Sequence, residues 1–290
     1  MCGFSLVELI IVIVITGILS ATTAIFIMAP VQGYFDSARR AEMTDIADTA
    51  LRRLGRDIRT AVPNSVRPAG TGTFIEFLPT RAGGRYRALP AAVPTAACGS
   101  AQNAVLDFGV AVPDTCFEIL GPQVNFTAND QIVIGSTQFD GIPPYISTAA
   151  GILRAHNNGM LGNRTTVDFT NAGLPEWAAL PSQRFSVVDG AQQAVTYACL
   201  GTQGMLDPNQ DGQARLMRYW SYGYQTPQRT PVQIAGMAHA EGVLADRVSR
   251  CVISYNAVNQ RFGVVEIQLE ITRGGESIRL YHQINVNNAP

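Results

Sequence analysis

Apolar positions dominate the start of the chain, where they form one long run. Every residue from Phe4 to Met28 is apolar or small except Glu8. As a helix with a rise of about 1.5 Å per residue, this run would extend roughly 38 Å, and a bilayer core is about 30 Å thick. The pattern therefore predicts a membrane-spanning helix over 4–29 that contains a single carboxylate.

The apolar pattern changes its period after this run. From Ala38 to Ala61, apolar residues recur every three or four positions, as they do on one face of an amphipathic helix. Pro63 then ends the helical pattern. The positions on the apolar face are Met43, Ile46, Ala50, Leu54, Ile58 and Ala61. We expect 30–62 to continue the helix, with this face packed on the protein's own sheet rather than in a coiled coil.

Two features modify the expected helix. Pro30 lacks a backbone donor and clashes one turn back, so we expect a kink or a loosened turn within 27–33. Opposite charges four residues apart are expected to form ion pairs on the polar side. These pairs are Asp48 with Arg52 and Arg53 with Asp57.

In the remainder of the chain, 63–290, short runs rich in β-branched residues are separated by turn residues, as in a β-rich globular domain. Turns predicted at 81–84 and 189–190 would join their flanking strands into hairpins, and 242–250 would form a helical turn. Between 139 and 180 the weak periodicity indicates loops with strand fragments. Strands are predicted at 73–78, 84–89, 105–109, 116–120, 131–135, 185–188, 194–199, 215–220 and 251–255.

The clearest strand pair closes the chain. Apolar residues alternate with polar ones over 265–271, a Gly-Gly turn follows at 274–275, and the alternation returns over 278–286. This pattern predicts a half-buried antiparallel hairpin whose apolar face lies on the amphipathic half of the helix. We therefore predict an α+β fold, in which a long N-terminal α-helix packs on an antiparallel β-sheet.

Composition narrows the range of functions. The 290 residues carry a formal net charge of −1, so the chain lacks the basic character typical of nucleic-acid binding. The histidines His156, His239 and His282 are far apart in the sequence. No G-x-S-x-G, P-loop or dinucleotide motif is present, and we expect neither an enzyme nor a cofactor.

Four cysteines follow the apolar run, and Cys2 precedes it. In an oxidising compartment, the four predict two disulfides with three possible connectivities. Nearest-neighbour pairing, Cys98 with Cys116 and Cys199 with Cys251, is the simplest. A zinc site is the alternative, but no pair has the C-x₂₋₄-C spacing of such sites.

The segment 207–213 resembles the first half of a calcium loop. Asp207, Asn209 and Asp211 offer oxygen ligands at alternate positions, and Gly212 supplies the sharp turn. The twelfth position is Arg218 instead of the glutamate that would complete the site. We interpret the segment as a polar turn, with a calcium site as the alternative.

Glu8 helps to decide which kind of N-terminal segment the apolar run is. A carboxylate in hydrocarbon costs a few kcal/mol or more unless it meets a partner. A signal peptide does not fit, because the run is too long and has neither a basic start nor an A-x-A site. The sequence Gly3-Phe4-Ser5-Leu6-Val7-Glu8 resembles the class III signal of type IV pilins and type II secretion pseudopilins.

This resemblance implies roles for three residues. A prepilin peptidase would cleave after Gly3 and methylate Phe4, and Glu8 would pair with the terminal amine of a neighbouring subunit. The expected partners are this peptidase, other pilins and minor pilins, the inner-membrane assembly platform and membrane lipid. The leader 1–3 has no basic residue, unlike those of the family. We expect the true start codon to lie upstream.

Two further stretches resemble a narrower group. Residues 54–67 and 185–288 are similar to the MshO-type minor pilins of MSHA pili, and 54–67 also to the J-type minor pseudopilin of type II secretion. The resemblance is weakest over 90–180, where we expect an insertion. It implies an initiating or tip-type minor pilin of an MSHA-like type IV pilus, with one pass through the bacterial inner membrane and a periplasmic domain. The alternatives are a minor pseudopilin and, more distantly, a membrane-anchored periplasmic enzyme or adhesin.

Overall fold

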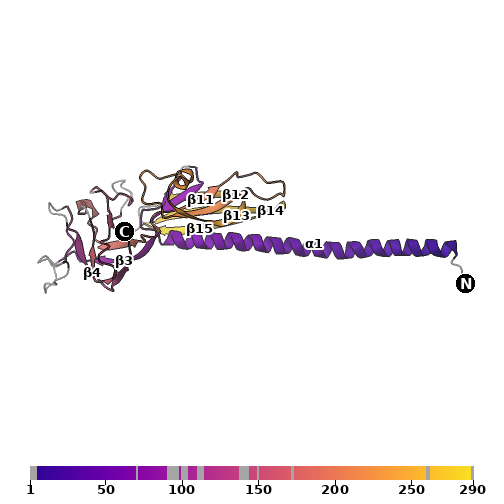
Figure 1. Ribbon diagram of the computed structural model, residues 1–290, viewed down its shortest axis with the longest axis horizontal. Coiled ribbons are helices and arrows are strands. Elements are labelled where there is room, and N and C mark those ends of the chain that lie inside the picture. Colours follow the sequence, from indigo (N-terminus) through magenta and orange to yellow (C-terminus); the bar gives the residue numbers. More distant parts are fainter. Residues whose placement is uncertain are drawn as a thin grey trace.

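One long helix, α1 (Leu6–Arg59), organises the molecule. The computed structural model describes residues 5–69, 71–89, 98, 104–109, 114–136, 144–148, 150–170, 173–258 and 262–288. The first half of α1 extends away from the rest of the chain, and its second half lies along a β-sheet (Figure 1). This arrangement confirms the predicted α+β fold, a long N-terminal helix packed on an antiparallel sheet.

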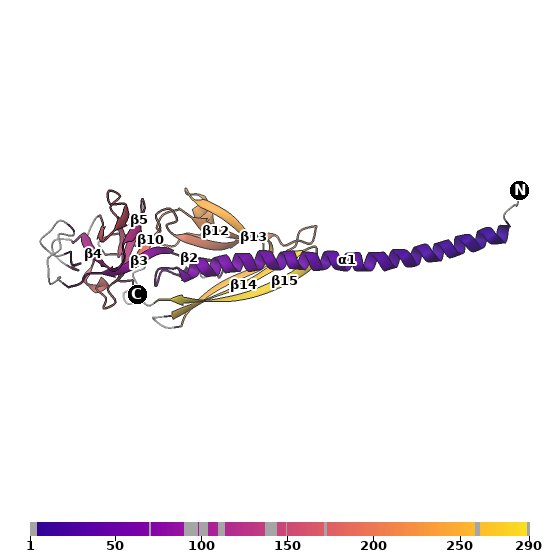
Figure 2. The same ribbon diagram turned by 90° about the horizontal axis from the view of Figure 1, so that it is seen from below.

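The sheet beside α1 has seven antiparallel strands, and we call it the helix-facing sheet. Its spatial order is β1-β2-β11-β12-β13-β14-β15. The helix contacts β13, β14 and β15 (Figure 2). The strands are β1 (Arg67–Pro68), β2 (Phe74–Phe77), β11 (Val195–Leu200), β12 (Ala214–Trp220), β13 (Ala240–Ala257), β14 (Phe262–Arg273) and β15 (Glu276–Asn287).

The predicted apolar stripe of the helix forms the core with this sheet. Met43, Leu54 and Ile58 are almost completely buried, and Ala47 and Leu51 fill the positions between the predicted ones. Burying each large side chain contributes about 1.5–3 kcal/mol, so packing rather than helix propensity fixes the helix on the sheet. The facing residues of the sheet include Val265, Ile267, Leu269, Ile271, Ile284 and Val286.

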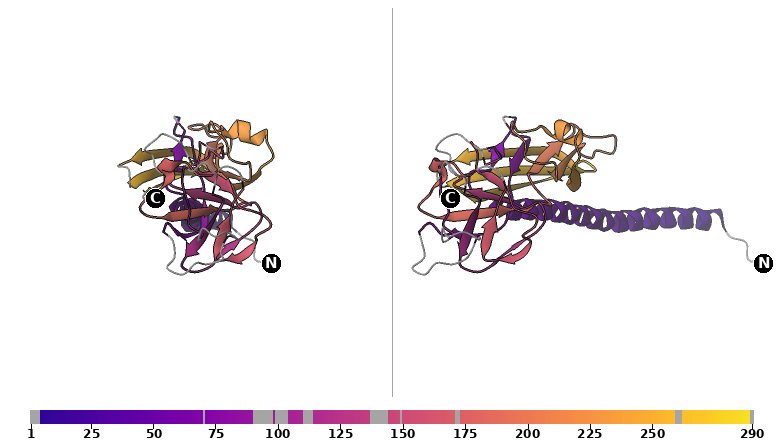
Figure 3. Two further views of the ribbon diagram at one scale, coloured as in Figure 1. Left: turned by 90° about the vertical axis from the view of Figure 1, so that its left-hand side faces the viewer. Right: turned by 60° about the vertical axis from the view of Figure 1, so that its left-hand side comes forward.

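A second group of strands lies beyond the end of α1, and we call residues 80–188 the distal lobe (Figures 1 and 3). Its six-stranded sheet has the order β7-β6-β10-β3-β4-β9, and β5 pairs with β8 beside it. The lobe has a separate core rich in aromatic residues. The strands are β3 (Thr80–Tyr86), β4 (Cys116–Leu120), β5 (Val124–Phe126), β6 (Gln131–Ile134), β7 (Leu153–Ala155), β8 (Gly162–Arg164), β9 (Thr166–Asp168) and β10 (Arg184–Val188).

The distal lobe is an insertion between two strands that pair with each other. β2 precedes it, β11 follows it, and the two are neighbours in the helix-facing sheet. The predicted hairpin of 185–188 with 194–199 is therefore wrong, because β10 pairs with β3 and β6 instead. After β10 the chain crosses to the other sheet at Gly190, whose amide donates to the Asp130 carboxylate. A Cβ at Gly190 would lie 2.3 Å from the backbone of Asn129, so only glycine fits this crossing.

The predicted turn at 81–84 is also wrong, because these residues lie inside β3. A Cβ at Gly83 would lie 2.7 Å from the Phe185 carbonyl oxygen, and one at Gly84 would lie 2.9 Å from the Phe185 ring. The two glycines therefore permit close packing of β3 on β10 and do not mark a turn.

Two other local predictions fail. Residues 242–250 belong to β13. The pairing of this strand shifts in register near Leu216 of β12 and near its own Val248, and these shifts disturb the alternation expected of a strand. The short helix of this region is α2 (Pro231–Ala235), which Thr230 caps. The strand expected over 105–109 is reduced to a single bridge at Phe108. A one-turn 3₁₀ helix spans Glu176–Ala178.

Candidate functional site in the exposed half of the long helix

The helix begins with a side-chain cap. The Ser5 hydroxyl accepts a hydrogen bond from the Glu8 amide at 3.2 Å, and the Ser5 carbonyl accepts one from the Leu9 amide at 3.2 Å. A serine cap satisfies one free donor of the first turn, and the acidic Glu8 opposes the positive end of the helix dipole. Gly3 and Phe4, the predicted cleavage site, lie outside the described residues.

The first half of α1 exposes apolar side chains on all sides. Leu6 is 76% exposed, Ile13 60% and Phe26 84%. An 18-residue window of this helix has a mean hydropathy of 2.6, and none of the window is buried. Within the described chain, α1 is the one helix that is both long enough and apolar enough to cross a membrane. A helix that is apolar all round needs lipid or other apolar helices around it.

Three threonine side chains of this half bond back to the helix itself. Thr16 donates to the Val12 carbonyl at 2.7 Å, and Thr23 donates to the Leu19 carbonyl at 2.7 Å. Thr22 bonds back to the preceding turn in the same way. These hydroxyl groups therefore do not require water, which suits a segment surrounded by hydrocarbon.

Pro30 lies inside the continuous helix. It cannot donate to the Phe26 carbonyl, so one backbone hydrogen bond of the helix is missing at this turn. We expected a kink or a loosened turn here. The helix curves gently in this half and shows no sharp break (Figure 2).

Aromatic residues mark the end of the apolar half. Tyr34 and Phe35 are exposed, and their rings meet edge to face at 5.9 Å between centroids. The first charges after Glu8 follow at once, with Asp36 and Arg39 paired at 3.0 Å. Exposed aromatic rings beside the first charges are typical of a membrane–water interface.

Ion pairs hold the helix to the β14–β15 turn just beyond these aromatic residues. Arg40 contacts Glu276 at 2.9 Å, and Glu42 contacts Arg273 at 2.5 Å. Gly274 and Gly275 form the turn itself with φ angles of +57° and +79°. The body of the protein is thus fastened to the helix next to the predicted membrane surface.

Residues 1–24 match the prokaryotic N-terminal methylation motif. The chain carries the signal of a type IV pilin or pseudopilin. No curated protein and no solved structure matches the chain. The methylation motif covers the cap, Glu8 and most of the exposed apolar surface described above.

Beyond the pilin signal, the calcium-like segment forms a structural turn. Asp207 accepts hydrogen bonds from the amides of Asn209 and Asp211, both at 2.8 Å. Asp211 pairs with Arg247 at 3.0 Å and also accepts from the Gly274 amide at 2.8 Å. Asp207 therefore shapes the loop itself, and Asp211 braces it against the β14–β15 turn. The described residues contain no group of three His, Cys, Asp or Glu side chains placed to hold a metal ion.

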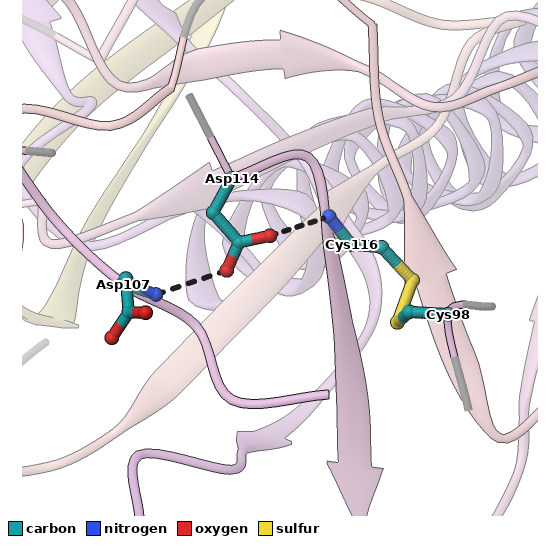
Figure 4. The surroundings of a disulfide bond; sticks show 4 residues. All are labelled: Cys98, Asp107, Asp114 and Cys116. Atoms are coloured by element: carbon teal, nitrogen blue, oxygen red, sulfur yellow. Dashed lines mark hydrogen bonds between the residues drawn. A yellow bond between two sulfur atoms is a disulfide. The ribbon is translucent and has the colours of Figure 1, made fainter. Parts of the chain in front are cut away.

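The pilin-like body contains two disulfides, in the nearest-neighbour pairing. Cys199 joins Cys251 in the core under the helix, and Cys98 joins Cys116 in the distal lobe. Beside the second bond, the Asp114 carboxylate accepts from the Asp107 and Cys116 amides at 3.0 and 3.3 Å (Figure 4). Burial raises the pKa of Asp114.

Sequence reasoning missed the contact that holds the other end of the helix. Asp57 was expected to pair with Arg53, but its carboxylate turns toward the sheet and contacts Arg218 and Tyr197. Arg53 forms no ion pair within the described part of the chain. One feature of the sequence could have indicated this contact, namely Arg218, a charged residue in the middle of a largely apolar strand.

Proposed function

We propose that this chain is a minor pilin of an MSHA-like type IV pilus. It is held in the bacterial inner membrane by the first half of α1, with its β-rich body in the periplasm, and it then enters the filament. The observation that carries the proposal is the methylation motif at the head of a helix whose apolar half has no partner within the described chain. The role is structural rather than enzymatic.

The uncovered half of α1 supports transfer from lipid to filament. Its surface is apolar except at Glu8, and the hydroxyl groups of Thr16, Thr22 and Thr23 bond back to the helix itself. Lipid tails and neighbouring apolar helices are equivalent surroundings for such a surface, so moving between them costs little. Packing and polar contacts between helices then decide whether a subunit remains in the filament.

Glu8 supplies the polar contact in this proposal. Cleavage after Gly3 would create a positively charged amine at Phe4, one helical turn before Glu8. A carboxylate and an ammonium group in hydrocarbon are each costly alone, and pairing between neighbouring subunits removes much of that cost. Because the pair forms only at one axial offset between helices, it also selects the register of assembly.

The β-rich body is attached rigidly to the second half of α1. Packing of the helix-facing sheet, the ion pairs at Arg40 and Glu42, and the contact of Asp57 with Arg218 fix α1 along its second half. A force applied to the exposed half is therefore transmitted to the whole body. This property suits a subunit that an inner-membrane assembly platform lifts out of the membrane.

A minor pseudopilin of a type II secretion system is the second candidate. The methylation motif favours both classes, since both carry it. An anchored periplasmic enzyme or adhesin is the distant alternative, and it would keep an uncleaved N-terminus.

The test is the mass of the intact membrane-extracted protein, made with and without an active prepilin peptidase. We expect a chain that starts at methylated Phe4 only when the peptidase is active. A Gly3→Val variant, which changes the residue before the cut, should remain uncleaved in both backgrounds. A chain that keeps its leader with the active enzyme would contradict the proposal. Co-purification with other pilus subunits or with secretion components then separates the two filament classes.

A further inference from the structure

A cleft of about 540 Å³ lies where the end of α1 meets the distal lobe. Residues 59–63 at the end of the helix form one wall, β3 and β10 form the floor, and residues 135–136 after β6 close it. Small-molecule sites commonly have volumes of about 300–1,000 Å³. The cleft is thus large enough for a small ligand. The end of α1 and strand β3, which line it, lie far from the exposed half of the helix (Figure 1).

Hydrogen bonds hold the walls of the cleft in place. The Thr80 amide donates to the Thr60 carbonyl at 2.7 Å, which ties β3 to the helix end. On the other side, the Ser136 hydroxyl donates to the Pro63 carbonyl at 2.5 Å, and the Asn64 amide group donates to the Ser136 carbonyl at 2.7 Å. The cleft is therefore preorganised rather than a gap between independent parts.

Three arginines line the cleft from three different elements. Arg59 comes from the last turn of α1, Arg85 from β3 and Arg184 from β10. The described residues that line the cleft include no Asp or Glu. Within the described chain, none of the three guanidinium groups forms an ion pair. The cleft is therefore positively charged without internal compensation.

Two of these arginines, both exposed to solvent, place like charges opposite each other. Arg85 and Arg184 are directly opposite in the antiparallel pair of β3 and β10. Like charges at such positions repel and destabilise a sheet. Arg81, four residues earlier on β3, instead has its own carboxylate, Asp130. The sequence thus neutralises one arginine on this strand and leaves the one beside the cleft uncompensated.

The lining of the cleft indicates which anion it accommodates. Guanidinium groups bind carboxylates and phosphates through paired hydrogen bonds. The walls also contain the apolar residues Ala61, Pro63 and Phe185, and the hydroxyl groups of Thr80 and Ser186. Apolar walls and a volume well above that of one inorganic ion favour a ligand with a carbon skeleton. We propose that this cleft binds a small organic anion with two or more carboxylate groups, held by Arg59, Arg85 and Arg184.

The experiment is a calorimetric titration of the full chain in detergent micelles with citrate, at constant ionic strength set by chloride. Inorganic phosphate serves as the comparison ligand. We expect saturable one-to-one binding of citrate and weaker binding of phosphate. Because each guanidinium group would form charge-assisted hydrogen bonds with a carboxylate of the ligand, Arg85→Gln and Arg184→Gln should each weaken citrate binding about tenfold or more.

Arg53→Gln is the matched control, since it removes one exposed positive charge from α1 outside the cleft. It should bind citrate like the unaltered chain. A second readout separates binding from structural support. Without citrate, Arg184→Gln should raise the unfolding temperature because it relieves the repulsion with Arg85, whereas a purely structural arginine would lower it.

Three results would overturn the inference. One is the absence of saturable citrate binding to the unaltered chain. Another is equal affinity in the Arg53→Gln, Arg85→Gln and Arg184→Gln variants, which would indicate general screening of charge. The third is phosphate binding as tight as that of citrate, which would exclude recognition of a carbon skeleton. These results are independent of N-terminal processing, so they do not depend on the proposed pilin function.

Discussion

The carboxylate of Asp57, in the last turn of α1, lies 3.1 Å from the Nε of Arg218 in the middle of β12. The same carboxylate oxygen accepts a hydrogen bond from the Tyr197 hydroxyl at 2.7 Å. Burial, followed by the charge of Asp57, raises the pKa of Tyr197, so its hydroxyl keeps the proton that it donates. The side chain of Arg218 is only 7% exposed, and Asp57 is its one ion-pair partner among the described residues, while its Nη2 also donates to Gln192 Oε1 at 2.6 Å.

Replacing Asp57 with asparagine should destabilise the protein. The change leaves the buried Arg218 guanidinium without a counter-charge, and breaking such a pair costs more than the pair contributes. Because Asp57 itself is 22% exposed, we expect a loss of about 2–3 kcal/mol in the free energy of unfolding. Denaturant titration of the full chain in detergent, followed by tryptophan fluorescence, measures it.

Asp48→Asn is the control for this experiment. Asp48 pairs with Arg52 on the exposed side of the same helix, at 2.7 Å. Exposed pairs of this kind are screened by solvent and contribute little to stability, so this variant should remain close to the unaltered chain. Equal losses in the two variants would show that Asp57 is merely another surface charge.

The failure of the Arg53–Asp57 prediction shows why sequence reasoning reached only part of the fold. The spacing of four residues is a local signal, and it was correct for Asp48 with Arg52. The actual partner of Asp57 is Arg218, which is 161 residues away in the sequence. A local sequence pattern cannot indicate a contact at that separation. The apolar face of the helix and the closing hairpin were predictable for the same reason, since both are local patterns.

The division of the strands between two sheets was not predictable from local patterns. Residues 185–188 and 194–199 have the alternation of a hairpin, and Asp189-Gly190 has the composition of its turn. The pairing is decided instead by β2, which lies more than a hundred residues before β11 and occupies the edge that β10 would need. The turn predicted at 81–84 was wrong for a similar reason, because glycines such as Gly83 and Gly84 permit close packing of strands as well as turns.

The two disulfides should differ in their contribution to stability. Cys199–Cys251 spans 52 residues and joins β11 to β13, which are not neighbours in the sheet. Cys98–Cys116 spans 18 residues. Loop-closure entropy gives about 4 kcal/mol for the longer loop and about 3 kcal/mol for the shorter one. Double alanine variants, compared by thermal unfolding, should therefore be less stable when the Cys199–Cys251 bond is removed.

Access to reductant should separate the disulfides further. Cys199 and Cys251 are buried in the core under α1, whereas Cys98 is partly exposed. Mild reduction of the folded protein, followed by alkylation and peptide mass analysis, should label Cys98 and Cys116 first. Labelling of the Cys199 pair at the same rate would mean that the helix does not protect that side of the sheet.

Acidification should destabilise the distal lobe through His156. This side chain is 3% exposed and stacks on Phe126 at 4.0 Å, and neither ring nitrogen has a hydrogen-bond partner among the residues that the structure describes. Burial lowers the pKa of His156, with Asp130 opposing and Arg164 adding to the shift. The unfolded chain therefore takes up the proton first as pH falls below about 6.5, and the free energy of unfolding decreases in that range.

Substituting His156 with phenylalanine keeps the ring stack and removes the titrating group. We expect hydrogen exchange of β5 and β7 to accelerate between pH 7 and 5 in the unaltered chain, after correction for the intrinsic pH dependence, and to stay constant in this variant. His239→Gln is the control, because the His239 ring contacts the Met237 carbonyl and Glu241. An unchanged acid response in the His156 variant would assign the effect to another group.

Glu8 provides the sharpest test of assembly, because it contacts none of the described residues of the body. Its backbone amide bonds to the Ser5 hydroxyl, which a side-chain replacement leaves intact. Glu8→Ala should therefore keep N-terminal processing and the unfolding temperature unchanged. If the carboxylate pairs with a neighbour's amine, losing it costs at least about 1.4 kcal/mol, and filament incorporation should fall about tenfold or more. Asp48→Asn, on the same helix but on its exposed side where it pairs with Arg52, is the control, and it should assemble normally in sheared filament fractions. Normal incorporation of Glu8→Ala would exclude this carboxylate from the assembly contact.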